Sequence, residues 1–353
     1  MANTIDRKKL SSYSAILAIL VVLIHTENLG LYSSLSDGSV FSAFVYKFEW
    51  LISKNIASVA VPSFFMISGI LFYRDFNISL YPKKLKSRFF SLILPFLLWN
   101  LFRFLLFYGL GKVGITEKLF LAPRLLFTRE NFLEGLFFYK YNLGFWFMYQ
   151  LILFTLLAPV IRLITKNKWI GLVVIFALIT LNASDVLGDF FIVVLKKRFI
   201  LLDCFIYYTI GAYIGTHFFD FVNKSNKFTK ISSVIGIILG QVFGFLFTKT
   251  EFILFNNLSL ITLVISFWYL YDLLHIKPLP VAVSSITFFI YAGHGTVLEF
   301  LQAIAGKLFG DSAIFAFLTY LTFPVITLGI LVGVSLILKK FLPRFWSLIN
   351  GAR

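Results

Sequence analysis

Long apolar runs separated by short polar segments dominate this chain. A helix needs about 20 predominantly apolar residues to cross a bilayer, whereas a transmembrane strand needs about 10 with an alternating pattern. The runs here are unbroken rather than alternating, so they predict helices. They lie at 11–32, 55–73, 89–110, 144–164, 168–183, 199–218, 231–248, 252–274, 281–305 and 312–338. We therefore predict an all-α fold, a polytopic membrane bundle of about ten transmembrane helices.

Composition excludes a soluble protein. Hydrophobic residues make up 59% of the 353 residues and charged residues only 14%. A soluble domain of this length could not bury so much apolar surface. We expect one integral-membrane domain over residues 1–353 with no extra soluble domain, its first apolar run acting as an uncleaved anchor. The short loops favour a bacterial plasma (inner) membrane as its location.

The net charge of +16 predicts topology rather than nucleic-acid binding, because the basic residues gather at the ends of the apolar runs. More Lys and Arg lie at the ends that share a side with the N-terminus, so both termini are expected in the cytoplasm. Lys196, Lys197 and Arg198 oppose this rule on the outer side. They are either a solvated loop cluster or contacts for an anionic substrate.

Ionisable residues inside apolar runs are the first candidates for chemistry. His25 lies about 21 Å along its run at about 1.5 Å per residue, in the outer half of the predicted span. A neutral imidazole there is either a general base or a packing residue that hydrogen-bonds between helices. Glu27 points to a different helix face, so Glu299 and Asp203 are better candidates to orient His25.

A basic segment precedes the third run, where Lys83, Lys84, Lys86 and Arg88 come before Pro95. It is either plain cytoplasmic anchoring or a site for a multiply charged anion such as a nucleotide cofactor. Pro95 would open the helix near that site. No metal site is expected.

Five segments, in order, resemble the acyltransferase-3 family of membrane O-acyltransferases. His25 matches the histidine of the family's first-span motif, although Ser14 stands at the motif's arginine position. Residues 64–69 match the Phe-Phe-x-x-Ser-Gly signature. Arg88 and Pro95 match part of the third-span motif. The remaining matches are Trp146-Phe147 in the fourth span and Tyr291 with His294 in the late Tyr-x-x-His span.

The resemblance implies transfer of an acyl group, most often acetyl, from cytoplasmic acyl-CoA to a hydroxyl of a surface carbohydrate or its lipid-linked precursor. His25 would act as general base or form an acyl-histidine, with His294 as a second catalytic group, an acceptor contact or a buried core histidine. The implied acetyl-CoA site comprises Ser68, Lys84, Lys86 and Arg88, although packing alone also explains Ser68. The implied acceptor contacts are Trp146, Tyr149, Tyr291 and Glu299.

Two other functions suit the same residues. Polar groups within apolar spans, among them His25, Ser68 and His294, also fit a transporter or flippase for a lipid-linked or anionic solute. The absence of an evident internal repeat weighs against that function. A non-catalytic partner in polysaccharide export is the third possibility. The sequence leaves the acceptor, the acyl group and the oligomeric state open.

Overall fold

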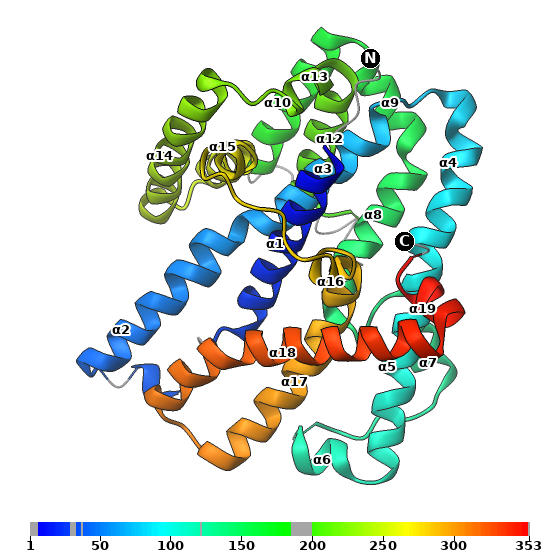
Figure 1. The fold of residues 1–353 in the computed structure, drawn as a ribbon, viewed down its shortest axis with the longest axis vertical. Helices are drawn as coiled ribbons and strands as arrows, with labels where there is room; N and C mark the ends of the chain where they lie inside the picture. Colours follow the sequence, from blue (N-terminus) through cyan, green and yellow to red (C-terminus); the bar gives the residue numbers. More distant parts are fainter. Residues whose placement is uncertain (1–5, 29–32, 37, 121, 185–199, 352–353) are drawn as a thin grey trace. The chain divides into compact units, whose positions relative to one another are not determined.

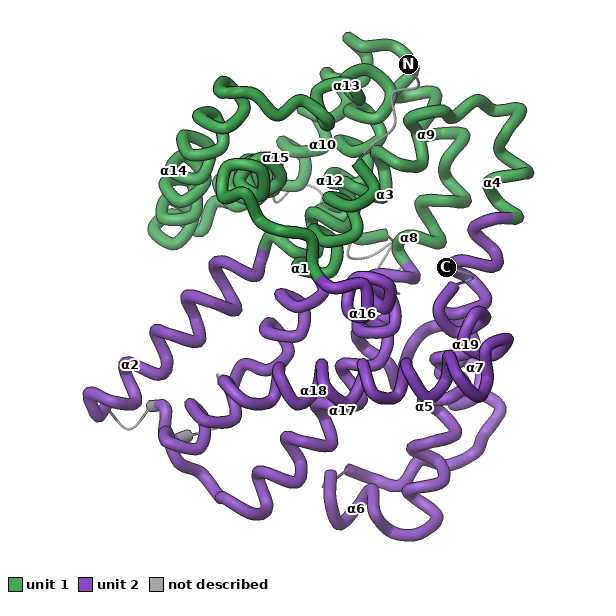
Figure 2. The backbone as a smooth tube through the Cα atoms, in the orientation of Figure 1, with its two compact units in different colours: residues 1–17, 59–86, 150–279 green, residues 18–58, 87–149, 280–353 purple. Residues whose placement is uncertain are grey.

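The computed structural model describes residues 6–28, 33–36, 38–120, 122–184 and 200–351. All regular structure in these residues is helical, with no strand among them (Figure 1). The chain forms two compact units (Figure 2). Unit 1 comprises residues 1–17, 59–86 and 150–279, and unit 2 comprises residues 18–58, 87–149 and 280–353. The chain passes from one unit to the other within α1, within η3 (Ala57–Val59), within α4, within α8 and between residues 279 and 280.

Unit 1 holds the start of α1 and a group of packed helices. Here α3 packs against α12, and α14 packs against α15. The elements are α1 (Arg7–Thr26, first part), α3 (Ala60–Tyr73), η4 (Ile78–Leu80), α4 (Tyr81–Arg88, most of it), α8 (Trp146–Leu156, most of it), α9 (Ala158–Lys166), α10 (Lys168–Ala183), α12 (Leu202–His217), α13 (Phe219–Val222), α14 (Lys227–Thr250) and α15 (Ile253–Leu273).

Unit 2 holds the rest of α1 and the C-terminal helices. Here α17 packs against α18, and α5 packs against α7 and α19. The elements are η1 (Ser33–Ser36), α2 (Val40–Glu49), η2 (Trp50–Ile56), η3 (Ala57–Val59), η5 (Phe89–Ile93), α5 (Leu94–Lys112), α6 (Ile115–Leu119), α7 (Arg129–Phe137), η6 (Leu143–Phe145), α16 (Val281–Ser284), α17 (Thr287–Phe309), α18 (Ala313–Phe341) and α19 (Pro343–Ile349).

The described residues contain seven helices long and apolar enough to cross a membrane. An eighth forms if the pair Leu143–Leu156 and Ala158–Lys166, bent by 66°, counts as one span. The predicted segments 168–183 and 199–218 are also helices, α10 and α12, but each has only 16 residues. The number of ten spans and the cytoplasmic termini therefore stay predictions. The basic cluster at 196–198 lies outside the described residues.

The sequence prediction missed a helix before the second span. Residues 40–73 form one continuous helical segment, α2 through α3, with π-helical turns at η2. Residues 40–54 contain Lys47, Glu49 and Lys54, which lower the hydropathy of the segment. Glu49 is nevertheless fully buried and accepts hydrogen bonds from the backbone N–H (2.7 Å) and the side-chain amide (3.1 Å) of Asn28. A buried carboxylate with partners is tolerated where an unpaired one is not.

Candidate active site

Two histidines from α1 and α17 meet in unit 2. The Nε2 atom of His294 lies 3.4 Å from the Nδ1 atom of His25, and the ring centroids are 4.8 Å apart. His294 is 3% exposed, whereas His25 is exposed. One imidazole is therefore enclosed by protein, and the other is open to an incoming molecule.

Backbone carbonyls fix the tautomer of each ring. The Nδ1 atom of His294 faces two acceptors, the carbonyl oxygens of Ile290 (3.1 Å) and Tyr291 (2.7 Å). It must therefore carry the proton, which leaves a lone pair on Nε2. The Nδ1 atom of His25 lies 2.8 Å from the carbonyl oxygen of Val21 as well as near that lone pair. It too must carry a proton, so the lone pair of His25 is on Nε2.

This arrangement poises His25 to accept a proton. Its Nε2 atom has no hydrogen-bond partner among the described residues, and its Nδ1–H faces two acceptors. When Nε2 takes a proton, the positive charge of the ring is stabilised by the Val21 carbonyl and by the His294 lone pair. The third group of a catalytic triad orients its histidine in the same manner. Here a second neutral histidine fills that position.

The C-terminal end of α1 is tied down just beyond His25. The amide of Gln302, on α17, donates to the carbonyl oxygen of His25 (3.3 Å), and Thr26 donates to Val22 (2.7 Å). Glu49 accepts from the next turn through Asn28. These contacts hold the last turn of α1 in place. Sequence reasoning missed Gln302 and Glu49 because neither belongs to a recognisable motif.

An ion pair lies within the predicted third and ninth spans. The Arg103 guanidinium donates to the carboxylate of Glu299, to the Thr296 hydroxyl (2.7 Å) and to the backbone carbonyl of Tyr141. Its side chain is 11% exposed. Glu299 is paired with Arg103 rather than with His25. Asp203 lies in unit 1, and its predicted role stays a prediction. The sequence signal that could have predicted this pair is the presence of one positive and one negative residue inside apolar spans.

We expect Glu299→Gln to lower the free energy of unfolding in detergent by about 2 kcal/mol, because a mostly buried guanidinium loses its counter-charge. The double change Arg103→Met with Glu299→Gln should recover part of that loss. Thermal unfolding of the four proteins in one double-mutant cycle measures the coupling. Additive losses would show that the pair contributes no interaction energy.

Aromatic rings pack around the start of α8. The Tyr291 hydroxyl donates to the carbonyl of Gly144 (2.7 Å), and its ring stacks on Phe145 at 5.8 Å. Tyr149 is 9% exposed and lies against Tyr139 (5.3 Å). Trp146 is half-buried. Tyr149 is therefore largely enclosed by packing, while Trp146 is partly exposed.

The basic residues of the predicted donor site do not all lie on one face of α4. Lys84 donates to the carbonyl of Phe72 and lies 4.9 Å above the Phe72 ring. Successive α-helical residues are rotated by about 100°, so Lys84 and Arg88 share a face of α4 and Lys86 points away. Ser68 is half-buried in α3 within unit 1. A donor site built from these residues stays a prediction.

Long apolar helices and a pair of contacting histidines define a helical membrane protein with a candidate catalytic site. Comparison with known proteins gives its family: residues 15–339 match the model of the acyltransferase domain family. The chain belongs to this family, the acyltransferase-3 family, and is a multi-pass membrane protein. It is 24% identical over 326 residues to the succinoglycan biosynthesis protein ExoH of Rhizobium meliloti (strain 1021), covering 86% of this chain and 83% of the relative. No solved structure matches it.

Proposed function

We propose that this protein transfers an acyl group, most simply acetyl, from cytoplasmic acyl-CoA to a hydroxyl of a cell-surface carbohydrate or its lipid-linked precursor. Membership of the acyltransferase family and similarity to a polysaccharide biosynthesis protein support this. The observation that carries the proposal is the free lone pair on Nε2 of exposed His25. The Val21 carbonyl and the buried ring of His294 both face Nδ1, which places the proton there and the lone pair on Nε2.

In the proposed reaction, His25 Nε2 removes the proton of the acceptor hydroxyl as its oxygen attacks the thioester carbonyl carbon. The new C–O bond forms, the C–S bond breaks, and the departing CoA thiolate takes the proton from the His25 imidazolium. His294 does not exchange a proton in this scheme. It accepts a hydrogen bond from His25 Nδ1–H and stabilises the transient positive charge. A covalent route through acyl-His25 uses the same lone pair.

The test is turnover of acyl-CoA by purified protein without any ion or solute gradient. Release of free CoA thiol that accelerates when a hydroxyl-bearing polysaccharide is added supports transfer. Acetyl-CoA and succinyl-CoA are compared side by side to define the acyl group. Gradient-dependent uptake of a lipid-linked sugar into proteoliposomes, with acyl-CoA left intact, would refute transfer and favour a transporter.

His294 provides a separate test of the hydrogen-bond arrangement. We expect His294→Phe to lower kcat about 10-fold to 100-fold. The Nε2 atom of His25 can still accept a proton in this variant, but its Nδ1–H loses one of its two acceptors. His294→Gln, whose carbonyl oxygen can accept that bond, should recover part of the rate. Initial rates of thiol release measure both variants. Equal rates in His294→Phe and wild type would assign His294 to packing alone.

A further inference from the structure

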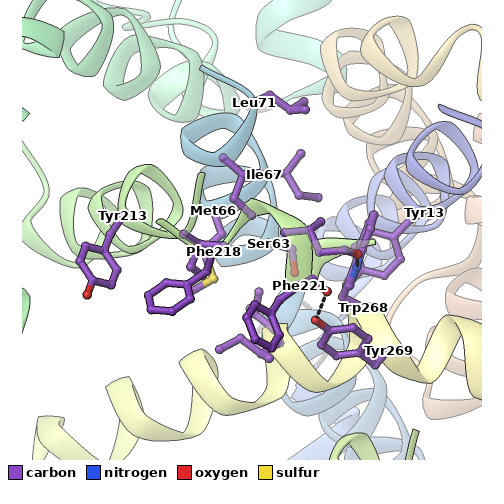
Figure 3. Close-up of a pocket in the computed structure, with 15 residues that line it drawn as sticks. Tyr13, Ser63, Met66, Ile67, Leu71, Tyr213, Phe218, Phe221, Trp268 and Tyr269 are labelled. Carbon is purple, nitrogen blue, oxygen red and sulfur yellow. Dashed lines mark hydrogen bonds between the residues drawn. The ribbon is translucent and has the colours of Figure 1, made fainter. Parts of the chain in front are cut away.

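A mostly apolar cavity of about 400 Å³ lies within unit 1, among α1, α3, α12, α13 and α15 (Figure 3). Aliphatic and aromatic side chains line it, including Met66, Ile67 and Trp268. On one side, the Tyr269 hydroxyl donates to the carbonyl of Phe221 (2.6 Å) and ties α15 to α13. The cavity shares no residue with the histidine pair. Its size is typical of a small-molecule site, but its lining suits an apolar molecule and not a sugar or nucleotide.

Two hydroxyls in the wall remain available to a ligand. Tyr13 is 4% exposed and Ser63 is fully buried. The two hydroxyls lie close enough to interact weakly with each other, but neither has a partner of full hydrogen-bond geometry among the described residues. A buried hydroxyl without a partner costs free energy that a ligand carbonyl would recover. The wall therefore offers donors to an ester as well as room for a hydrocarbon chain.

Ammonium groups lie over the aromatic rings that line the cavity. Lys168 Nζ lies 4.8 Å from the Phe218 ring centroid, and Lys224 Nζ lies 4.1 Å from that of Phe221. Both lysines are exposed, and no salt bridge joins either one to a carboxylate in the described part of the chain. Lys9 lies 4.1 Å from the Trp268 ring but is neutralised by Asp272 at 2.6 Å. Two uncompensated cations thus accompany an apolar cavity.

We propose that this cavity binds an anionic glycerophospholipid. The acyl chain fills the apolar cavity, an ester carbonyl accepts hydrogen bonds from Tyr13 or Ser63, and the phosphate faces Lys168 and Lys224. The surrounding bilayer supplies such a lipid at high concentration. The two positive charges favour an anionic headgroup over a zwitterionic one of equal chain length.

Photo-crosslinking of the purified full chain tests the site. The probes are phosphatidylglycerol and phosphatidylcholine carrying the same diazirine-bearing acyl chain. We expect labelled peptides from α3, α12 and α15, with phosphatidylglycerol labelling at lower concentration. Replacing Lys168 and Lys224 with Gln should weaken phosphatidylglycerol labelling about fivefold for each lysine. Lys249→Gln is the matched control, because Lys249 lies 5.5 Å above the Phe245 ring on α14, away from the lining.

A second variant tests the chain-binding part independently of charge. Ile67→Trp places an indole in the cavity and should weaken labelling by both lipids. Equal labelling by the two lipids, or an equal loss in Lys249→Gln, would overturn the proposed anionic site. Displacement of the lipid by excess acetyl-CoA would also overturn it, since the cavity would then belong to the acyl donor. Acyl transfer by the enzyme is not used as a readout, so the two proposals fail separately.

Discussion

Replacing His25 with Gln should lower kcat for acyl transfer about 10²-fold to 10⁴-fold, the typical contribution of a general base. The glutamine amide cannot accept a proton at neutral pH, although its size allows it to fill much of the same space. Because His25 lies at the exposed end of the pair, the loss should appear in kcat with KM for acyl-CoA nearly unchanged. Initial rates of CoA thiol release measure it.

His217→Gln is the matched control for that experiment. Like His25, His217 is a helical histidine whose ring bonds a backbone carbonyl, that of Thr165 at 2.8 Å, but it is half-buried and belongs to unit 1. Wild-type activity in His25→Gln would refute the general-base role. Acid quenching of wild type without acceptor separates the two chemical routes. An acyl group found on His25 by mass spectrometry indicates a covalent intermediate.

Hydropathy predicted most of the helices because the length of each apolar run can be read from the sequence alone. Each predicted run has a helix in the structure, and the family resemblance drawn from five short motifs is confirmed. The helix at 40–59 was missed for a physical reason. Its charges resemble those of a loop. Lys47 and Lys54 are exposed, and the one buried charge, Glu49, is stabilised by hydrogen bonds from Asn28, a tertiary contact that no local pattern shows.

The sequence singled out the individual histidines of the candidate site but did not predict that they contact each other. His25 and His294 each stood out as polar groups inside apolar runs. Their contact across 269 positions depends on how α1 and α17 lie together, which no local pattern encodes. The sequence prediction therefore sought a carboxylate to orient His25, whereas the structure places a histidine there. Glu299 was chosen for its depth and instead pairs with Arg103.

Replacing Gly211 with Ala should lower the free energy of unfolding by about 3 kcal/mol or more. A Cβ at Gly211 would collide with the backbone carbonyl of Met66, and one at Gly215 would lie 2.5 Å from the carbonyl oxygen of Ile70. Backbone atoms of a packed helix cannot move aside as a flexible side chain can, so α3 and α12 must separate. The spacing of these glycines is the small-xxx-small pattern of closely packed membrane helices. Thermal unfolding in detergent measures the loss.

Gly329→Ala is the control, because a Cβ at that position of α18 meets nothing within 4 Å. It should be neutral or raise stability by about 0.5–1 kcal/mol, since Ala restricts the unfolded chain more than Gly. Equal stability of Gly211→Ala and wild type would contradict the close packing of α3 and α12. Gly69 meets α12 in the same way through the carbonyl of Tyr208. Packing therefore accounts for Gly69 of the Ser68-Gly69 motif, and the role of Ser68 in donor binding stays a prediction.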